Sequence, residues 1–93
     1  MSDGVLLRIR RAIQNGRYVF TDHVLEEAEA DNLTTDDVLQ VLLTGDLDST
    51  YSDDPRGVRY VVRGSIESLE IDVVCKFRSD GSVLIIITVY VID

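Results

Sequence analysis

Residues Val83–Ile92 have the sequence VLIIITVYVI, which is mostly β-branched and contains no charged side chain. A strand with one face in water alternates apolar and polar residues, whereas this run is apolar at nearly every position. It is too short to cross a bilayer as a helix, and its β-branched composition is unfavourable for a helix in water. The run therefore predicts the central strand of a sheet, with both of its faces covered by the rest of the chain.

The length and composition of the chain indicate a single globular domain, residues 1–93. Of the 93 residues, 45% are hydrophobic and 28% are charged, which is typical of a folded chain. Because the sequence shows no signal peptide and no transmembrane pattern, we expect a soluble cytoplasmic protein. One cysteine and one histidine exclude an internal disulfide and argue against a structural zinc site, so we expect no metal and no cofactor. Cys75 lies in an apolar strand pattern and is predicted to be a buried thiol.

The net charge of −8 is unevenly distributed along the chain. Residues 1–21 contain four arginines and one acid, residues 22–54 contain eleven acids and no lysine or arginine, and residues 55–93 contain five of each sign. Because phosphate contacts supply most non-specific affinity for nucleic acid, the acidic middle third disfavours RNA as a ligand. It suits a basic partner, or it is a solvated helical face.

Apolar residues at helical spacing predict a first helix over residues 4–15, which Asn15-Gly16 should end. Arg8 and Arg11 share one side of this helix, either as a solvated face or as an electrostatic patch. Arg10 lies close to the polar face. The segment after the helix, residues 17–20, is short and β-prone, so it is predicted to be extended.

A second helix should start at Thr21 or Asp22, both of which are favourable N-cap residues. His23 would lie in its first turn, where the helix dipole favours a neutral imidazole. This position suits a general acid or base, and it also suits a structural histidine that ties the helix to a strand. A third helix should begin with a capping box from Thr34 and end at Gly45, acting as a C′ glycine.

The rest of the chain predicts an antiparallel meander. The expected strands and connections are a weak strand at 47–51, a loop at 52–57, a strand at 58–63, a loop at 64–68, a strand at 69–77, a hairpin turn at 78–82 and the last strand. We therefore expect an α+β fold, with the N-terminal helix and the acidic helical hairpin on one face of about four strands. The last strand of a meander lies at an edge, which either residues 17–20 or a second copy of the chain should cover.

The sheet face away from the helices is the expected place for a site. It should carry Arg59, Arg63, Lys76 and Arg78, with Thr88 and Tyr90 from the last strand. The simplest role of Arg59 and Arg63 is to pair with Glu70 and Asp72 on the next strand. The sequence has no paired-carboxylate signature, no Ser-His-Asp pattern and no glycine-rich phosphate loop.

Several motifs resemble the DUF4258 family of small bacterial proteins, which are common in cyanobacteria. The most specific are the Phe-Thr-x-His sequence at residues 20–23 and the Thr-x-Tyr sequence at residues 88–90. The resemblance implies kinship with the RelE-like and MqsR-like toxins, which cleave mRNA, and a neighbouring gene for a zinc-finger antitoxin-like protein. It implies a RelE-like fold, and it makes the matched positions site candidates: Thr21, His23, Tyr60, Thr88 and Tyr90, with Arg59 as a basic helper.

The chain departs from this family pattern along the second helix. Family members often carry arginines where this chain has Glu27 and Asp31, and a glycine where it has Asn32. Phosphodiester cleavage needs positive groups near the charge that develops on the phosphate oxygens. Acids at these positions therefore oppose ribonuclease activity, even if the fold is shared.

Two functions of different classes follow. The first is a protein-interaction module on a RelE-like scaffold, catalytically weak or inert, that binds a zinc-finger antitoxin-like protein or a second copy of itself in a toxin–antitoxin-type pair. The second is a toxin-like endoribonuclease with His23 as general acid or base and with Arg59 and Tyr90 near the phosphate. The candidate binding residues are Thr21, Tyr60, Arg63 and Thr88. The sequence does not decide whether the protein is an enzyme.

Overall fold

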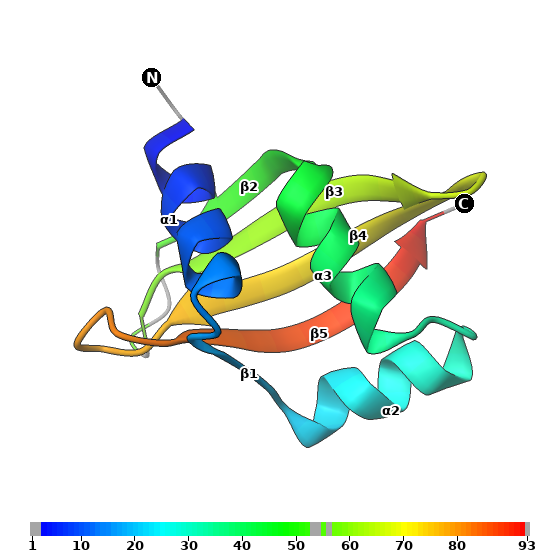
Figure 1. Cartoon of the computed structure of the whole chain (residues 1–93), viewed down its shortest axis with the longest axis horizontal. Coiled ribbons are helices and arrows are strands. Elements are labelled where there is room, and N and C mark those ends of the chain that lie inside the picture. Colours follow the sequence, from blue (N-terminus) through cyan, green and yellow to red (C-terminus); the bar gives the residue numbers. More distant parts are fainter. Residues whose placement is uncertain (1–2, 53–54, 56, 93) are drawn as a thin grey trace.

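The computed structural model describes residues 3–52, 55 and 57–92 of the chain. Figure 1 shows the three helices and five strands that these residues form: α1 (Asp3–Gln14), β1 (Tyr18–Phe20), α2 (Asp22–Ala30), α3 (Thr35–Thr44), β2 (Asp46–Tyr51), β3 (Arg59–Ile66), β4 (Leu69–Phe77) and β5 (Leu84–Ile92). None of the described helices has the length and apolar character that a membrane crossing requires.

The strands form one sheet in the order β1-β5-β4-β3-β2. Neighbours from β2 to β5 are antiparallel, which confirms the predicted meander, and β1 adds a fifth strand that runs parallel to β5. Tyr18 pairs with Leu84 and Phe20 with Ile86, so the segment at residues 17–20 covers the first part of the edge of the last strand. Of the two segments that the sequence suggested for this edge, residues 17–20 and a second copy of the chain, the first pairs with β5.

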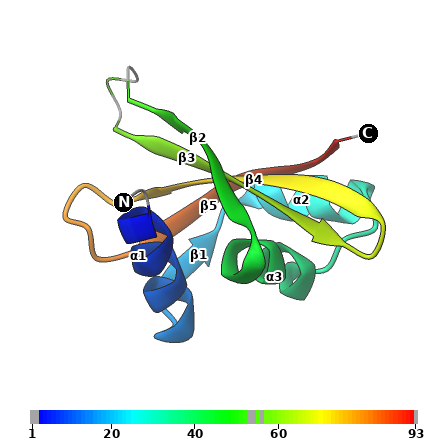
Figure 2. The same ribbon diagram turned by 90° about the horizontal axis from the view of Figure 1, so that it is seen from above.

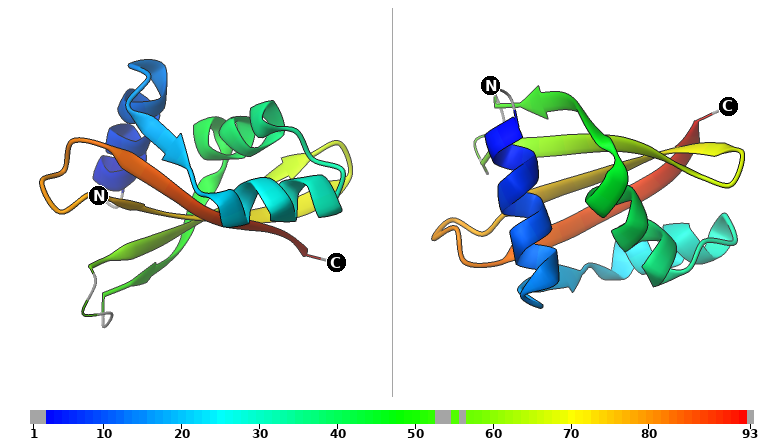
Figure 3. Two further views of the ribbon diagram at one scale, coloured as in Figure 1. Left: turned by 90° about the horizontal axis from the view of Figure 1, so that it is seen from below. Right: turned by 45° about the horizontal axis from the view of Figure 1, so that its top comes forward.

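All three helices lie on the same side of the sheet, as Figures 2 and 3 show. α2 packs along β5, α3 packs on β3 and β4, and α1 packs beside α3. The α+β class predicted from the sequence is therefore confirmed. We call the side of the sheet without helices the helix-free face.

The expectation that both faces of the last strand are covered is met on one face only. Ile86 and Val89 are fully buried under the helices, whereas Tyr90 points to the helix-free face and is 43% exposed. A β-bulge between Val74 and Cys75 in the pairing with β5 leaves Ile87 without a partner residue and shifts the alternation of β5. Outward apolar side chains of β5 are thus half-buried by their neighbours rather than by another layer of the fold.

The core lies between the helices and the sheet and draws on every helix. Its fully buried side chains include Ile9 of α1, Val24 of α2, Leu42 of α3 and Ile71 of β4. Cys75 belongs to this core, as predicted, and burial raises the pKa of its thiol to about 12. Val61 is also buried but lies outside this cluster, because its position in β3 directs it to the helix-free face.

The local helix signals predicted from the sequence are confirmed. Thr21 is the N-cap of α2, and its hydroxyl accepts the Val24 N–H. Thr34 and Asp37 form the capping box of α3. Gly16, with φ of 71°, ends the turn after α1 in the left-handed region.

Two glycines have roles that the sequence interpretation missed. Gly45 follows α3 in an extended conformation rather than as a left-handed C′ residue, and a Cβ there would lie 2.5 Å from the Arg63 carbonyl oxygen. Gly64 lies inside β3 rather than in a loop, where a Cβ would lie 3.2 Å from Val41 Cγ1. Both glycines therefore allow α3 to approach β3 closely, and β3 extends to Ile66.

Candidate functional site

The helix-free face carries an ion pair at its centre. Arg63 of β3 and Asp72 of β4 are directly opposite in the sheet. Nε of Arg63 donates to Oδ1 of Asp72 at 2.8 Å and Nη2 donates to Oδ2 at 3.2 Å, so the pair is bidentate. Asp72 is only 3% exposed, and its hydrogen bond and charge raise the pKa of Arg63. The pairing predicted between Arg63 and an acid of the next strand is confirmed for Asp72.

Tyr90 extends this network from Arg63 to β5. It is the register partner of Asp72 in the sheet. Burial, together with the charge of Asp72, raises the pKa of the Tyr90 hydroxyl. Arg63, Asp72 and Tyr90 therefore lie side by side on three neighbouring strands, with the buried carboxylate between the guanidinium and the phenol.

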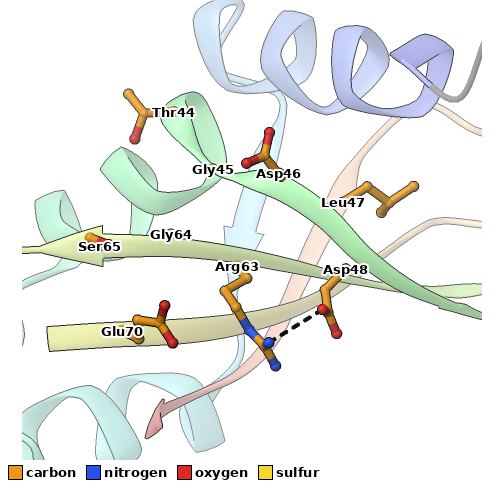
Figure 4. A pocket seen from close by; sticks show the side chains of 9 residues that line it. All are labelled: Thr44, Gly45, Asp46, Leu47, Asp48, Arg63, Gly64, Ser65 and Glu70. Carbon is orange, nitrogen blue, oxygen red and sulfur yellow. Dashed lines mark ion pairs between the residues drawn. The ribbon is translucent and has the colours of Figure 1, made fainter. Parts of the chain in front are cut away.

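An open hollow of about 450 Å³ lies at the β2 edge of the sheet, beside the end of α3. We call it the acidic hollow; its lining residues are Thr44, Gly45, Asp46, Leu47, Asp48, Arg63, Gly64, Ser65 and Glu70, all labelled in Figure 4. Asp48 and Arg63 turn toward each other there, with Oδ1 of Asp48 3.4 Å from Nη1 of Arg63. Glu70 also acts electrostatically on Arg63.

The charge of this hollow is dominated by carboxylates. Asp46, Asp48 and Glu70 line it, and Asp72 lies behind its single arginine. Three carboxylates, those of Asp48, Glu70 and Asp72, thus act on one guanidinium that already makes two hydrogen bonds, while Asp46 adds a further negative charge to the lining. Such an arrangement attracts a cationic group and repels a phosphate.

The predicted catalytic trio is not assembled. His23 is exposed on α2, which packs along β5 on the helix side, whereas Tyr90 points to the helix-free face. Among the described residues, no hydrogen bond, ion pair or ring contact joins His23 to Tyr90. Arg59 is half-buried in β3, opposite Tyr51 of β2. The catalytic roles of these residues stay predictions.

The predicted binding residues are dispersed as well. The Thr21 hydroxyl donates to the Ile87 carbonyl at 2.9 Å, so Thr21, rather than His23, ties α2 to β5. Tyr60 packs against the core and contacts the Phe77 ring, with centroids 6.4 Å apart. Thr88 is half-buried in β5, opposite Val74. Only Arg63 and Tyr90 are brought together, through Asp72.

The sequence interpretation did not predict that the three carboxylates of the acidic hollow lie together. Asp46 and Asp48 belong to β2, and Glu70 lies two strands away on β4. The sequence feature that could have indicated them is the pair Asp46 and Asp48, which alternate in a strand with few apolar residues. Their meeting with Glu70 depends on the register of β3 with both neighbours, which is a tertiary property.

Within the described part of the chain, no group of three or more His, Cys, Asp or Glu side chains is arranged to hold a metal ion. No curated protein and no solved structure is significantly similar to the chain. A family model described as a domain of unknown function matches residues 20–91, from the last residue of β1 to Val91 in β5. The chain therefore belongs to the DUF4258 family.

Proposed function

We propose that the protein is an interaction module, catalytically weak or inert, that binds a basic segment of a protein partner at the acidic hollow. The observation that carries the proposal is the charge of the hollow, where three carboxylates line a space of about 450 Å³. A lysine or arginine side chain of a partner would enter it and pair with Asp48 and Glu70. This side chain would share Asp48 with Arg63 and leave the bonds between Arg63 and Asp72 in place.

The neighbouring strand edge supplies the rest of the proposed contact. β2 is the last strand of the described sheet and pairs with β3 on one side only. An extended partner segment can add to such an edge through backbone hydrogen bonds. Asp46 and Asp48 on this edge would repel the same acids of a second copy, because like charges across paired strands are destabilising. The edge therefore favours a basic partner over self-association.

The wider charge distribution supports the same choice. α2 and α3 carry exposed acids, among them Asp22 and Asp36, which would extend the attraction beyond the hollow. We propose, from the family resemblance, that the partner is the zinc-finger antitoxin-like protein of a toxin–antitoxin-type pair in the cytoplasm. A ribonuclease built on His23 receives no support from the geometry, because the trio that it needs is dispersed over two sides of the sheet.

The proposal is tested with a short synthetic peptide that has two arginines in a β-prone sequence, measured by fluorescence anisotropy. The variant Asp48→Asn/Glu70→Gln should weaken binding by roughly tenfold or more, because it removes two charge-assisted contacts. The matched control is Glu26→Gln/Glu29→Gln, which removes the same charge from exposed positions of α2. Equal losses in the two variants, or no loss in either, would contradict the proposed site.

A further inference from the structure

A second, smaller hollow lies near the other end of β4 and has the opposite charge. We call it the arginine hollow; its volume is about 160 Å³ and its described lining residues are Arg8, Arg11, Ala12, Arg17, Phe77, Gly81 and Ser82. α1 and the connection between β4 and β5, which form it, lie at the same end of the sheet in Figure 1. Three of these seven residues are arginines and none is acidic.

The three guanidinium groups of this hollow are not neutralised within the described chain. Arg8, Arg11 and Arg17 are exposed, and none of them forms an ion pair or a side-chain hydrogen bond with another described residue. Arg10, on the same helix, is different, because its Nη2 donates to the Gly45 carbonyl at 2.6 Å and holds α1 against the end of α3. Arg10 of α1 therefore has a structural role, whereas Arg8 and Arg11 of the same helix line the hollow.

Three contacts within the described chain hold the arginine hollow in shape. The guanidinium carbon of Arg8 lies 4.3 Å from the centre of the Phe77 ring, and stacking on this face leaves the N–H edges of Arg8 available. The backbone of Arg17 is fixed by the Ala12 carbonyl at 2.8 Å and by the N–H of Leu84 at 3.0 Å. Arg17 therefore joins the end of α1 to the start of β5.

The nearest acid of the β4–β5 connection is already engaged. Asp80 accepts hydrogen bonds from the N–H and the hydroxyl of Ser82 at 2.9 and 2.6 Å. These bonds, together with the charge of Arg78, lower the pKa of Asp80. Asp80 thus folds back on its own turn, and it is not among the residues that line the hollow.

We propose that the arginine hollow binds the phosphate group of a small phosphate-bearing molecule. Guanidinium groups match phosphate oxygens through paired N–H donors, and three arginines line this hollow. The hollow, at about 160 Å³, is much smaller than the acidic hollow of about 450 Å³, which favours a compact group such as a phosphate. A long polyanion is disfavoured, because a chain leaving the hollow would meet a protein of net charge −8.

This site is independent of the acidic hollow, because the two hollows share no lining residue. The family match, residues 20–91, includes Phe77, Gly81 and Ser82 of the arginine hollow but none of its three arginines. Failure of peptide binding at the acidic hollow would leave this inference untouched.

The experiment is a titration followed by amide NMR, with inorganic phosphate, a 5′-mononucleotide and single-stranded RNA without a terminal phosphate as separate probes. We expect saturable shifts at Gly81 and Ser82 with phosphate and with the mononucleotide, weaker at high salt. Arg11→Gln/Arg17→Gln should weaken both by roughly tenfold or more, because each variant position loses a charge-assisted contact.

The control is Arg78→Gln, which removes an exposed arginine next to the hollow but not from its lining. Affinity should stay within about twofold in this variant, and thermal unfolding of all variants should show that they are folded. Absence of saturation, or an equal loss with Arg78→Gln, would overturn the inference. Tighter binding of the RNA than of the mononucleotide would replace the small molecule by a nucleic acid and overturn it as well.

Discussion

The acidic and the arginine hollow use the same side chain in opposite ways. Arg63 in the acidic hollow is held by a buried carboxylate, so its charge is used within the fold. Arg8, Arg11 and Arg17 have no such partner among the described residues, and only an aromatic ring supports one of them. The number of arginines at a surface therefore does not predict whether that surface can bind an anion. What decides this is whether each arginine already has an acidic partner within the fold.

The two hollows also differ in what holds them in place. The acidic hollow lies over the closest approach of α3 to the sheet, at Gly45 and Gly64, and its arginine bonds to a residue at the centre of the sheet. The arginine hollow is built from one exposed helix face and a turn. Changes at the first should therefore alter the stability of the whole domain, while changes at the second should alter mainly binding.

The largest expected effect comes from Gly45→Ala. A Cβ at this position would lie 2.5 Å from the Arg63 carbonyl and 2.7 Å from the Val41 carbonyl, both of which are backbone atoms that cannot rotate away. We expect the free energy of unfolding in urea to fall by about 3 kcal/mol, as for severe overpacking. Peptide affinity at the acidic hollow should fall too, while phosphate affinity at the arginine hollow should not.

Gly4→Ala is the matched control for this variant. Gly4 lies in α1, and a Cβ there would have no heavy atom within 4 Å. This change should be neutral or should stabilise the protein by up to about 1 kcal/mol, because alanine favours a helix. If both glycine variants were neutral, close packing of α3 on β3 would not explain Gly45.

A smaller loss is expected from Asp72→Asn. The substitution removes the charge that Arg63 and Tyr90 share, at a side chain that is only 3% exposed. We expect the free energy of unfolding to fall by about 2 kcal/mol. Loss of one partner of a fully buried ion pair costs roughly 3–5 kcal/mol, and the loss should be smaller here because 41% of the Arg63 side chain is exposed. Urea unfolding measures this, and Asp36→Asn on exposed α3 should change stability by less than about 0.5 kcal/mol.

Asp72→Asn should also change the pKa of Tyr90. The pKa of Tyr90 in the fold lies above its ordinary value of about 10, so the neutral phenol contributes stability below that pH, and the contribution is lost as the pH rises through the raised pKa. Without the charge of Asp72, the Tyr90 pKa should move down toward its ordinary value. An NMR titration of the Tyr90 ring checks this; an unchanged pKa would mean that burial alone causes the shift.

The sequence predicted the features of this fold that depend on neighbours along the chain. The capping box of Thr34, the N-cap at Thr21 and the left-handed Gly16 are local, and all are confirmed. Gly45 ends α3 as predicted but not in the left-handed conformation, and Gly64 was misinterpreted as a loop residue, because each glycine makes room for a segment that is far away in sequence. Periodicity identifies strands but not how closely a helix will approach them.

The candidate sites show the same limit. Helical spacing placed Arg8 and Arg11 on one side of α1, but it could not show that Arg10 reaches the Gly45 carbonyl, 35 residues away. Motif matching collected His23 and Tyr90 as one site, whereas the sheet directs Tyr90 away from α2. Residue types could be nominated from the sequence, but their grouping depends on register and on the side of the sheet.

The smallest expected effect concerns how much Arg8, in the arginine hollow, contributes to the stability of the fold. Arg8→Gln and Phe77→Leu, made singly and together, should give a coupling energy of about 0.5–1 kcal/mol in urea unfolding, as for an exposed cation–π contact. Arg11→Gln should show no coupling to Phe77→Leu, because Arg11 has no ring contact. A coupling as large as the loss at Asp72 would make Arg8 a structural residue like Arg63. The contrast between a charge used by the fold and a charge kept for a ligand would then fail, since both hollows would hold their arginines for stability.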